Sequence, residues 1–393
     1  MLDVPPRGSI VRVGLLLLAI ASGCTVRPTA PSHPVQERAQ YQRVAWAALP
    51  GWAEDSIDEA WAGFRASCTP LLQRPEWRAI CGEMQSVPAQ DPQAQRRFFE
   101  TRFDVLRLLR DTGDRKPQSE GLITGYYEPL LHGARKRSAA FPVPLYGVPD
   151  DLLTVDLSSV FPELAGKRIR GRLQGNKVVP YYSRAEIDAA PSVRGKELVW
   201  VSDAVDAFFL QVQGSGRVQL NTGETIRLQF ADVNGQPYRS IGRYLVDQGE
   251  LTLDEASAPA IREWIRVHPD RAREVLNANP SVVFFSEAPL RDPNEGPKGA
   301  LGVPLTPGRS LAVDPRYIPL GTPVFVTTTD PLTQTPLRRL MVAQDTGGAI
   351  KGILRADWFF GFGATAAEQA GRMRSQGSVW MLWPKGAPLP QGT

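Results

Sequence analysis

The sequence predicts a mainly β fold with flanking helices, built from two β-rich parts. Gly and Pro number 35 each among 393 residues, and this density of chain-turning residues favours many short strands over a helical bundle. Helical apolar spacing is confined to a few stretches, whereas short β-like runs recur from about residue 120 onward. The apolar content of 42% and the net charge of +4 are those of a globular chain and exclude a disordered one.

The N-terminus has the features of an export signal. Two arginines precede an apolar run at residues 13–21 that is too short to span a membrane as a helix. Small residues followed by Cys24 resemble the lipobox of a bacterial lipoprotein, in which this cysteine is acylated. A plain signal peptide with a chance cysteine is the alternative. We expect a lipoprotein signal peptide over 1–23 and a tether over 24–40, which places the protein on a membrane leaflet in an oxidising compartment.

Helices are expected next along the chain. Apolar side chains in DSIDEAWAGFRASC recur at helical spacing behind Asp55, which we predict as the N-cap residue. The stretch PQAQRRFFETRFDVLRLL (92–109) shows a similar stripe, and its aromatic side chains are assigned to a core. Cys68 and Cys81 lie close together in an exported chain, so we expect a structural disulfide, with two buried thiols as the alternative.

Strand candidates dominate both β-rich parts, with turn residues between them. Those of the first part are residues 121–131, 141–147, 166–173, 197–203, 206–220, 224–233 and 281–285. Those of the second part are 309–314, 321–329, 338–345 and 377–383. Helices are expected over 239–251 and 254–280, and over 364–376 with Gly377 as the C-cap of the last one.

Two aspartates bracket a glycine-rich loop in AQDTGGAIKGILRADWFFGFG (343–363). A strand ending at Asp345 would deliver one carboxylate to a sheet edge, and Asp357 returns beside the aromatic residues 358–360. Aromatic neighbours desolvate a carboxyl group, which raises its pKa and suits a general acid, and sugar rings stack on aromatic faces. The loop therefore predicts a site that cleaves glycosidic bonds. The alternative is that both aspartates cap turns.

This loop resembles the three-aspartate module of the membrane-bound lytic murein transglycosylase A family, and the resemblance covers about residues 120–385. Further motifs agree in order, namely TGYYEP (124–129), LQVQGSGRVQL (210–220), YRSIGRYLVDQGEL (238–251), NPSVVFF (279–285) and GALGVPLTPGRSLAVD (299–314). The resemblance implies a double-psi β-barrel catalytic domain, an inserted second β-barrel-like domain and a substrate groove between them. The implied bounds are 41–133 for the helical part and first strand, 134–295 for the insertion and 296–393 for the three-aspartate barrel.

The family uses one aspartate as both acid and base, and Asp357 matches it by position in the motif. The reaction implied is non-hydrolytic cleavage of the β-1,4 bond between N-acetylmuramic acid and N-acetylglucosamine in peptidoglycan during cell-wall turnover, which leaves 1,6-anhydro ends. Asp345 is the second catalytic candidate, in a supporting role, with a structural turn as its alternative. Asp314 would be the third aspartate, as scaffold.

The residues expected to bind substrate are Thr124, Tyr126, Tyr127, Gln211, Gln213, Gly214, Ser215, Gly347, Gly348 and Lys351. Strand alternation implies that only one of Tyr126 and Tyr127 faces the groove, and that Gln211 and Gln213 share one strand face. Core packing of the tyrosines, a tight Gly-Ser-Gly hairpin and a solvated loop lysine are the structural alternatives.

Several classes of function are disfavoured. Three scattered histidines make neither a metal set nor a Ser-His-Asp triad, so no metal and no cofactor is expected. No Lys/Arg-rich tract points to nucleic acid. The expected partners are peptidoglycan glycan strands, the membrane through the N-terminal lipid, and cell-wall synthases or scaffold proteins. The chain would be a monomer on the periplasmic face of the outer membrane of a Gram-negative bacterium.

Two other functions remain open. A lipid-anchored hydrolytic glycosidase on the same barrel would need a second carboxylate, for which Asp345, Asp206 and Glu128 are candidates. A non-catalytic peptidoglycan-binding lipoprotein would need none. Anhydro products, reducing ends or no cleavage would distinguish the three.

Overall fold

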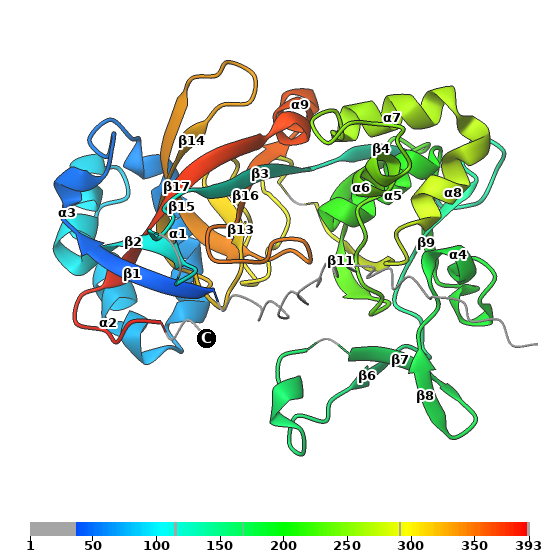
Figure 1. The fold of residues 1–393 in the computed structure, drawn as a ribbon, viewed down its shortest axis with the longest axis horizontal. Coiled ribbons are helices and arrows are strands. Elements are labelled where there is room, and N and C mark those ends of the chain that lie inside the picture. The colour runs from blue at the N-terminus through cyan, green and yellow to red at the C-terminus, as the bar shows by residue number, and fades with distance from the viewer. Residues whose placement is uncertain (1–36, 114–115, 168, 291, 391–393) are drawn as a thin grey trace, which may run out of the picture. The chain divides into compact units, whose positions relative to one another are not determined.

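The computed structural model describes residues 37–113, 116–167, 169–290 and 292–390 (Figure 1). Within these residues the strands form sheets of eight, six and three strands, accompanied by helices, so the prediction of a mainly β chain with helices is confirmed. No helix of the described part is long and apolar enough to cross a membrane. The expected signal peptide and the cysteine at position 24 lie outside the described residues.

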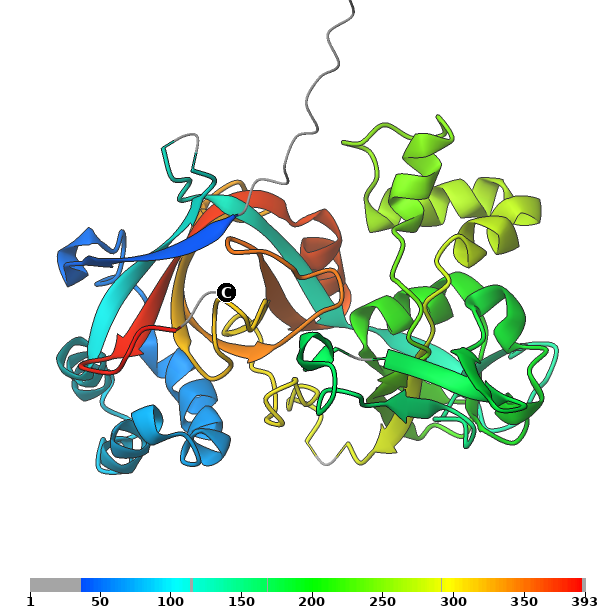
Figure 2. The same cartoon turned by 60° about the horizontal axis from the view of Figure 1, so that its bottom comes forward.

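The eight-stranded sheet brings distant parts of the chain together. Its strands, in order, are β1 (Arg38–Val44), β2 (Phe103–Asp111), β17 (Arg374–Pro384), β14 (Pro323–Thr329), β15 (Pro336–Asp345), β13 (Ser310–Val313), β16 (Ala356–Phe362) and β3 (Gly121–Glu128). Strand β3 also pairs with β17, so the strands from β17 to β3 close into a ring, which Figure 2 shows. The ring therefore needs a strand from near residue 120 and strands from beyond residue 310.

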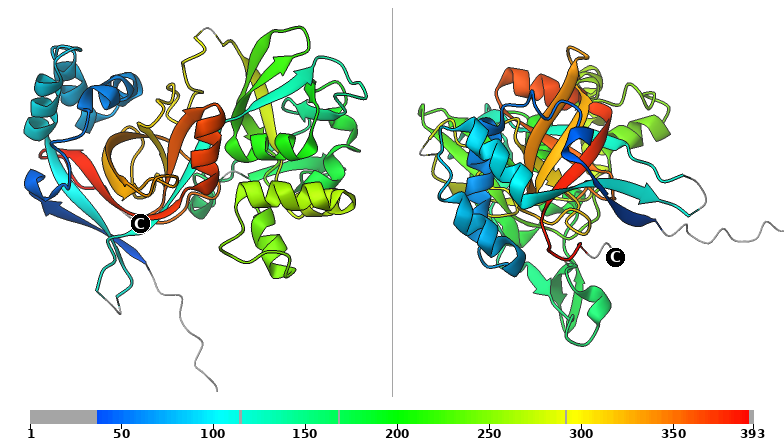
Figure 3. Two further views of the ribbon diagram at one scale, coloured as in Figure 1. Left: turned by 90° about the horizontal axis from the view of Figure 1, so that it is seen from above. Right: turned by 90° about the vertical axis from the view of Figure 1, so that its left-hand side faces the viewer.

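Three helices cover one side of this sheet, as Figure 3 shows in blue and cyan. They are α1 (Ile57–Leu71), α2 (Pro75–Met84) and α3 (Pro92–Arg102), and their buried side chains join those of the strands in one hydrophobic core. Aromatic rings dominate this core, and Trp61 meets both Phe98 and Phe99 edge to face. The structure contains the expected disulfide between Cys68 and Cys81, which joins α1 to α2.

The middle of the chain forms the other two sheets. The six-stranded sheet has the order β12 (Val283–Ala288), β11 (Thr225–Val233), β10 (Ser215–Leu220), β4 (Leu130–Ala134), β9 (Glu197–Val201) and β5 (Val143–Tyr146). The three-stranded sheet is β6 (Leu153–Val155), β7 (Ile169–Gln174) and β8 (Lys177–Pro180). The helices here are α4 (Arg184–Ile187), α5 (Ala204–Gln213), α6 (Ile241–Asp247), α7 (Ala258–Val267) and α8 (Ala272–Asn277). The remaining helix, α9 (Ala364–Arg372), joins β16 to β17.

A buried ion cluster lies where the chain passes between the two larger sheets. Glu128 ends β3, is fully buried, and accepts hydrogen bonds from Arg217 at 2.9 Å and Arg227 at 2.7 Å. Both arginines also donate to backbone carbonyls of the segment that returns to the ring: Arg217 to Pro293 and Arg227 to Glu295. The outgoing and returning segments are thus tied to the same two guanidinium groups.

Two helices end earlier than the sequence predicted. The stretch 92–109 is helical only to Arg102, because from Phe103 the backbone pairs with β1 on one side and β17 on the other. The last helix ends at Arg372, and Gly377 lies inside β17 instead of capping it. A Cβ at Gly377 would come within 2.7 Å of the Thr327 carbonyl oxygen on β14, so the glycine permits close strand contact.

The segment 206–220, predicted as one strand, is a helix followed by a strand. The Asp203 carboxylate accepts from the amides of Val205 and Asp206 and so caps α5. Gly214, with a φ of 82°, ends the helix in the left-handed conformation, and β10 begins at Ser215. The helix buries Phe208 and Phe209 against α6, α7 and α8.

Apart from β2, which was expected to be helical, four strands were not predicted, namely β1, β6, β8 and β16. Strand β1 begins at Arg38, so residues 38–40 belong to the sheet and not to the expected tether. Strand β16 covers the aromatic stretch around Asp357, where no strand was expected, and it pairs with β13 and β3.

Asp55 is not the N-cap residue of α1, because Ser56 takes that position and has no side-chain cap bond. The Asp55 carboxylate instead accepts hydrogen bonds from the Arg309 guanidinium at 2.9 and 3.0 Å and from the Leu340 amide at 2.6 Å. Arg309 is 1% exposed and also donates to the carbonyls of Ser56 and Leu340. This buried pair fastens the start of α1 to the ring.

Arg309→Met should lower the free energy of unfolding by about 3–5 kcal/mol, because it removes the buried partner of the Asp55 carboxylate and leaves only the more distant, partly exposed Arg339 at 3.5 Å. Arg266→Met, at an exposed helical pair with Glu263, should cost less than about 1 kcal/mol. Urea denaturation of both variants measures the difference. Equal losses would show that the buried pair is unimportant.

Candidate functional site

Asp357 is the second residue of β16, which lies between two strands of the ring, β13 and β3. Its cross-strand neighbours are Thr124 on β3 and Ala312 on β13. The residues on either side of it, Ala356 and Trp358, are buried in the main hydrophobic core. Because successive side chains of a strand point to opposite faces, Asp357 faces away from that core. The Thr124 hydroxyl donates a hydrogen bond to Oδ1 of Asp357.

The surroundings of Asp357 favour its protonated form. Burial raises the pKa of the carboxyl, while the nearby Arg355 charge and the Thr124 hydrogen bond oppose that rise without cancelling it. A carboxyl group with a raised pKa can hold a proton and then give it up, which is the property that a general acid requires.

Asp345 ends β15, and its cross-strand neighbour is also Ala312, so the two carboxylates flank this one residue. Its Oδ1 accepts from the amides of Ala300 and Thr346, both at 2.9 Å, and its Oδ2 accepts from the Tyr126 hydroxyl at 3.1 Å. Burial raises the pKa of Asp345 to about 6, against the effect of these hydrogen bonds, and the Asp357 charge adds to the rise.

Asp314 holds the loop that connects the other two aspartates. It is 1% exposed and accepts from the Gly352 amide at 2.9 Å and from the Arg316 guanidinium at 3.0 and 2.6 Å. Burial would raise the pKa of Asp314, but the bonds from Arg316 and Gly352 outweigh it and lower that pKa. Gly352 has a φ of 115°, which an L residue rarely adopts. Glycine at this position therefore allows the backbone conformation in which the amide donates to Asp314.

The other loop residues expected to bind substrate are accessible to different extents. Gly348 and Lys351 are exposed, and Gly347 is partly exposed. A Cβ at Gly347 would meet Ile350 at 2.6 Å, whereas one at Gly348 would meet nothing within 4 Å. Gly347 is therefore required by local packing, and Gly348 is not.

Tyr126 and Tyr127 point to opposite faces of β3, as strand alternation predicts. Tyr126 is 8% exposed, packs on Phe359 with ring centroids 5.1 Å apart, and directs its hydroxyl to Asp345. The amide of Tyr127 donates to the Gln213 side chain at 3.0 Å. Gln213 thus fastens the end of α5 to the strand that carries Thr124.

Gln211 lies on α5 and not on a strand, and it is held within the fold. Its side-chain oxygen accepts from Arg184 at 2.8 Å and from the Val283 amide at 3.3 Å. Gly214 ends the helix and Ser215 starts β10. The structure therefore brings four of the expected site residues together, namely Thr124, Tyr126, Asp345 and Asp357. Gln213 contacts the same strand through the Tyr127 amide. The Gln211 side chain does not join this group, because it binds Arg184 and Val283.

The aromatic wall expected beside Asp357 is absent. Trp358 is 2% exposed and Phe359 is fully buried, and only Phe360 of the three is partly exposed. Two of the rings are core residues on the two faces of β16, so they cannot stack on a sugar.

Arg355 was missed by the sequence analysis. Its guanidinium donates to the Thr124 hydroxyl at 2.7 Å, so it belongs to the hydrogen-bonded group around Asp357. The only feature of the sequence that could have indicated Arg355 as a site residue is its position two residues before Asp357.

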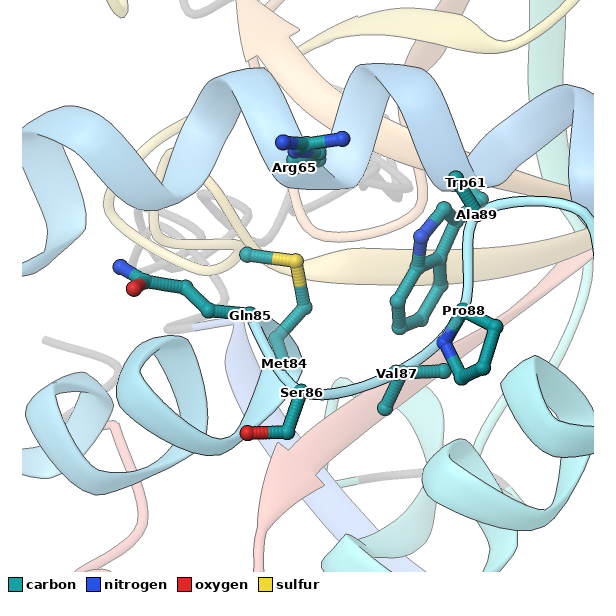
Figure 4. A pocket seen from close by; sticks show the side chains of 8 residues that line it. All are labelled: Trp61, Arg65, Met84, Gln85, Ser86, Val87, Pro88 and Ala89. Carbon is teal, nitrogen blue, oxygen red and sulfur yellow. The ribbon is translucent and has the colours of Figure 1, made fainter.

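Other kinds of site find little support in the described residues. No three His, Cys, Asp or Glu side chains of this part of the chain come together as a metal-binding group. A hollow of about 290 Å³ in the helical region is lined by Trp61, Arg65 and residues 84–89 (Figure 4). It contains none of the expected site residues.

Comparison with known proteins finds two family models in this chain. One is described as the MltA specific insert domain and matches residues 122–286, and the other is the 3D domain and matches 309–383. The matched parts include β3 except Gly121, the six-stranded sheet up to Ser286 in β12, and the ring strands from β13 to β17 up to Trp383.

Curated relatives and solved structures agree with these models. Membrane-bound lytic murein transglycosylase A of Escherichia coli K12 is 36% identical over 66% of this chain and 64% of its own length, just under two thirds. Its namesake in Vibrio cholerae is 31% identical over 73% of this chain and 71% of its own length. The crystal structure of MltA from Neisseria gonorrhoeae, in the monoclinic form, matches with a TM-score of 0.75 and 38% identity over 89% of this chain and 94% of its own. E. coli MltA with bound chitohexaose matches with a TM-score of 0.64 and 27% identity, over 92% and 100%.

Asp314→Asn should loosen the loop that it holds, because a hydrogen bond to a charged group contributes about 1.5–3 kcal/mol. The Gly352 amide should then exchange its hydrogen roughly tenfold faster or more. Asp330→Asn is the matched control, since this aspartate accepts from the Leu332 and Thr333 amides in another turn. Unchanged protection of Gly352 in Asp314→Asn would contradict the assignment.

Asp345→Asn should gain stability relative to the wild type as the pH rises from about 4 to about 7. The folded wild type binds the Asp345 proton more tightly than the unfolded wild type does. The free energy of unfolding of the wild type therefore decreases as the pH rises through this window, and that of the variant does not. Asp330→Asn should show no such gain across this range, because the pKa of Asp330 is lowered and its carboxylate stays ionised there. Thermal unfolding across this range tests both, and parallel curves would refute a raised Asp345 pKa.

Proposed function

Because the chain belongs to the membrane-bound lytic murein transglycosylase A family, we propose that it is a lytic transglycosylase that cleaves peptidoglycan. The observation that carries the proposal is the partly buried Asp357, whose carboxyl group has a raised pKa and receives a hydrogen bond from Thr124. Chitohexaose, which one solved relative binds, is a β-1,4-linked chain of N-acetylglucosamine, and peptidoglycan glycan strands have the same linkage.

The reaction needs one acid and base. Asp357 gives its proton to the glycosidic oxygen as the bond from this oxygen to C1 of the muramoyl residue breaks. The resulting carboxylate takes the proton of the C6 hydroxyl of the same residue, and the C6 oxygen bonds to C1. The product has a 1,6-anhydro end, no water is consumed, and Asp357 is protonated again. The sugar supplies the nucleophile, so no second carboxylate is required.

Asp345 is assigned a supporting role in this reaction. Its oxygens accept from Ala300, Thr346 and Tyr126, which orders the chain around Asp357, and the Asp357 charge helps to raise the pKa of Asp345. Thr124 and Tyr126 belong to the same hydrogen-bonded group. The substrate contacts proposed for the site are Thr124, Tyr126, Tyr127, Gln213, Gly214, Ser215, Gly347, Gly348 and Lys351, with Gln211 as a support of α5.

The finer description of the fold is also a proposal. The closed ring of strands and the 3D domain match at 309–383 support a double-psi β-barrel over 296–393 with β3 as its partner strand. The match of an insert domain to 122–286 supports an inserted domain at 134–295, with the substrate groove between the two. The lipid anchor at position 24, and with it the outer-membrane location, rests on the lipobox and on the names of the membrane-bound relatives.

The hydrolytic alternative is not favoured. Glu128 is fully buried between Arg217 and Arg227, where it meets no water. Asp206 is paired with Arg262. Asp345, the remaining candidate for a second carboxylate, already accepts three hydrogen bonds from the protein.

Digestion of peptidoglycan sacculi tests the proposed function. The wild-type chain should release muropeptides lighter by one water than hydrolytic products, and Asp357→Asn should reduce this release by roughly 100-fold or more, because the general acid is lost. Asp247→Asn, at an exposed pair with Arg243 on α6, should digest as the wild type does. Mass spectrometry of the products provides the measurement.

Three results would contradict the proposal in different ways. Reducing-end products would indicate a hydrolase. Intact sacculi that still bind the protein would indicate a binding lipoprotein. Full activity of Asp357→Asn would assign the acid to another residue, with Asp345 as the next candidate.

A further inference from the structure

Arg355 stands immediately before β16 and is partly buried beside Asp357. One terminal nitrogen donates to the Thr124 hydroxyl at 2.7 Å, and the other donates to the Ala356 carbonyl at 2.6 Å. The guanidinium forms no salt bridge within the described residues, and the carboxylate whose charge acts on it is Asp357. Its strongest polar side-chain contact is therefore the hydroxyl that in turn contacts Asp357.

The chemistry of a hydroxyl makes this chain of contacts directional. Thr124 has one hydroxyl hydrogen, and an arginine can only donate. Since the Thr124 oxygen accepts from Arg355, its single hydrogen is left to point at Oδ1 of Asp357. Oδ1 accepts the hydrogen bond from Thr124, so a carboxyl proton on Oδ1 would compete with the Thr124 hydrogen for the same side of this oxygen. The proton of neutral Asp357 is thereby directed to Oδ2.

We propose that Arg355 is a positioning residue for the general acid: acting through Thr124, it fixes the Asp357 carboxyl so that Oδ2 carries the transferable proton. The inference rests on the proposed function, since it assigns the acid to Asp357. Oδ1 remains bound to Thr124 throughout the reaction. Oδ2 gives the proton to the glycosidic oxygen and later receives the proton of the C6 hydroxyl.

The charge of Arg355 has a second effect on the same group. Burial raises the pKa of Asp357, and Arg355 is the nearest charge that opposes the rise. The other titratable groups around it are Asp345 from β15 and Tyr126 from β3. Arg374 on β17 lies opposite Thr124 in register, but its guanidinium donates to the Leu253 carbonyl at 2.8 Å. Arg355 therefore keeps Asp357 able to ionise, as the second half of the reaction requires.

The test compares pH profiles of kcat/KM for the release of anhydro products from sacculi. Wild-type activity should fall as the pH rises through the raised pKa of Asp357, because the acid must be protonated. Arg355→Met should lower the maximum by roughly tenfold or more through loss of orientation. It should also move the alkaline limb to higher pH, because removal of a positive charge raises the pKa further. Arg355→Lys should restore the position of the limb and part of the rate.

Variants of neighbouring residues separate positioning from general damage. Thr124→Val should reduce the rate as Arg355→Met does, and Thr124→Ser, which keeps the hydroxyl, should stay near the wild type. Arg374→Met removes a positive charge that lies opposite Thr124 in register but points its guanidinium to the Leu253 carbonyl, so its profile should match the wild type. A wild-type profile for Arg355→Met, or the same shift for Arg374→Met, would overturn the proposal.

A direct titration makes the result independent of activity. In protein labelled with ¹³C at aspartate carboxyl carbons, with the Asp357 signal assigned through Asp357→Asn, the Asp357 titration should move to higher pH in Arg355→Met. Absence of that movement would overturn the proposal whatever the rates show. If the wild type releases no anhydro products while the titration moves as expected, the proposed function fails and the coupling of Arg355 to Asp357 stands.

Discussion

The parallel pairing of β3 with β16 is the contact on which the candidate site depends. It places Thr124 opposite Asp357 and Tyr126 opposite Phe359. The strand that supplies Thr124 and Tyr126 lies more than 200 residues before the strands that supply the two aspartates. Strand β3 also pairs with β17, and this second pairing closes the ring. Loss of this register would separate the Asp357 carboxyl from the Thr124 hydroxyl that donates to it.

Buried charges hold the frame around this pairing. Asp55 and Arg309 fasten α1 to the ring, and Glu128 with its two arginines fastens the ends of the middle segment to it. Such pairs add little net stability compared with apolar packing, since both partners lose hydration, but an unpaired member is costly. Their contribution is to penalise every arrangement other than the observed one, and the position of a catalytic carboxyl must be held to within a fraction of an ångström.

The sequence was sufficient for much of the fold and for singling out the pair of aspartates, because these follow local patterns. Most strands, the disulfide and the pair of aspartates are signalled by short stretches. The failures have non-local causes. Apolar spacing around Phe103 fits a helix, and only pairing with β17 makes it a strand. Asp55 has the sequence of a cap, but its partner is Arg309. Arg355 belongs to the candidate site through its hydrogen bond to Thr124, a contact between distant segments that no local pattern indicates.

The closed ring also determines when the site can exist. During synthesis β3 is made early, but its neighbours β16 and β17 are among the last strands of the described chain. Contacts between such distant segments form late, because a long loop must be closed before they bring any gain. Asp357 therefore cannot meet Thr124 until β16 has been made, more than 200 residues after β3. The topology thus delays assembly of the candidate site until its last strands are available for pairing.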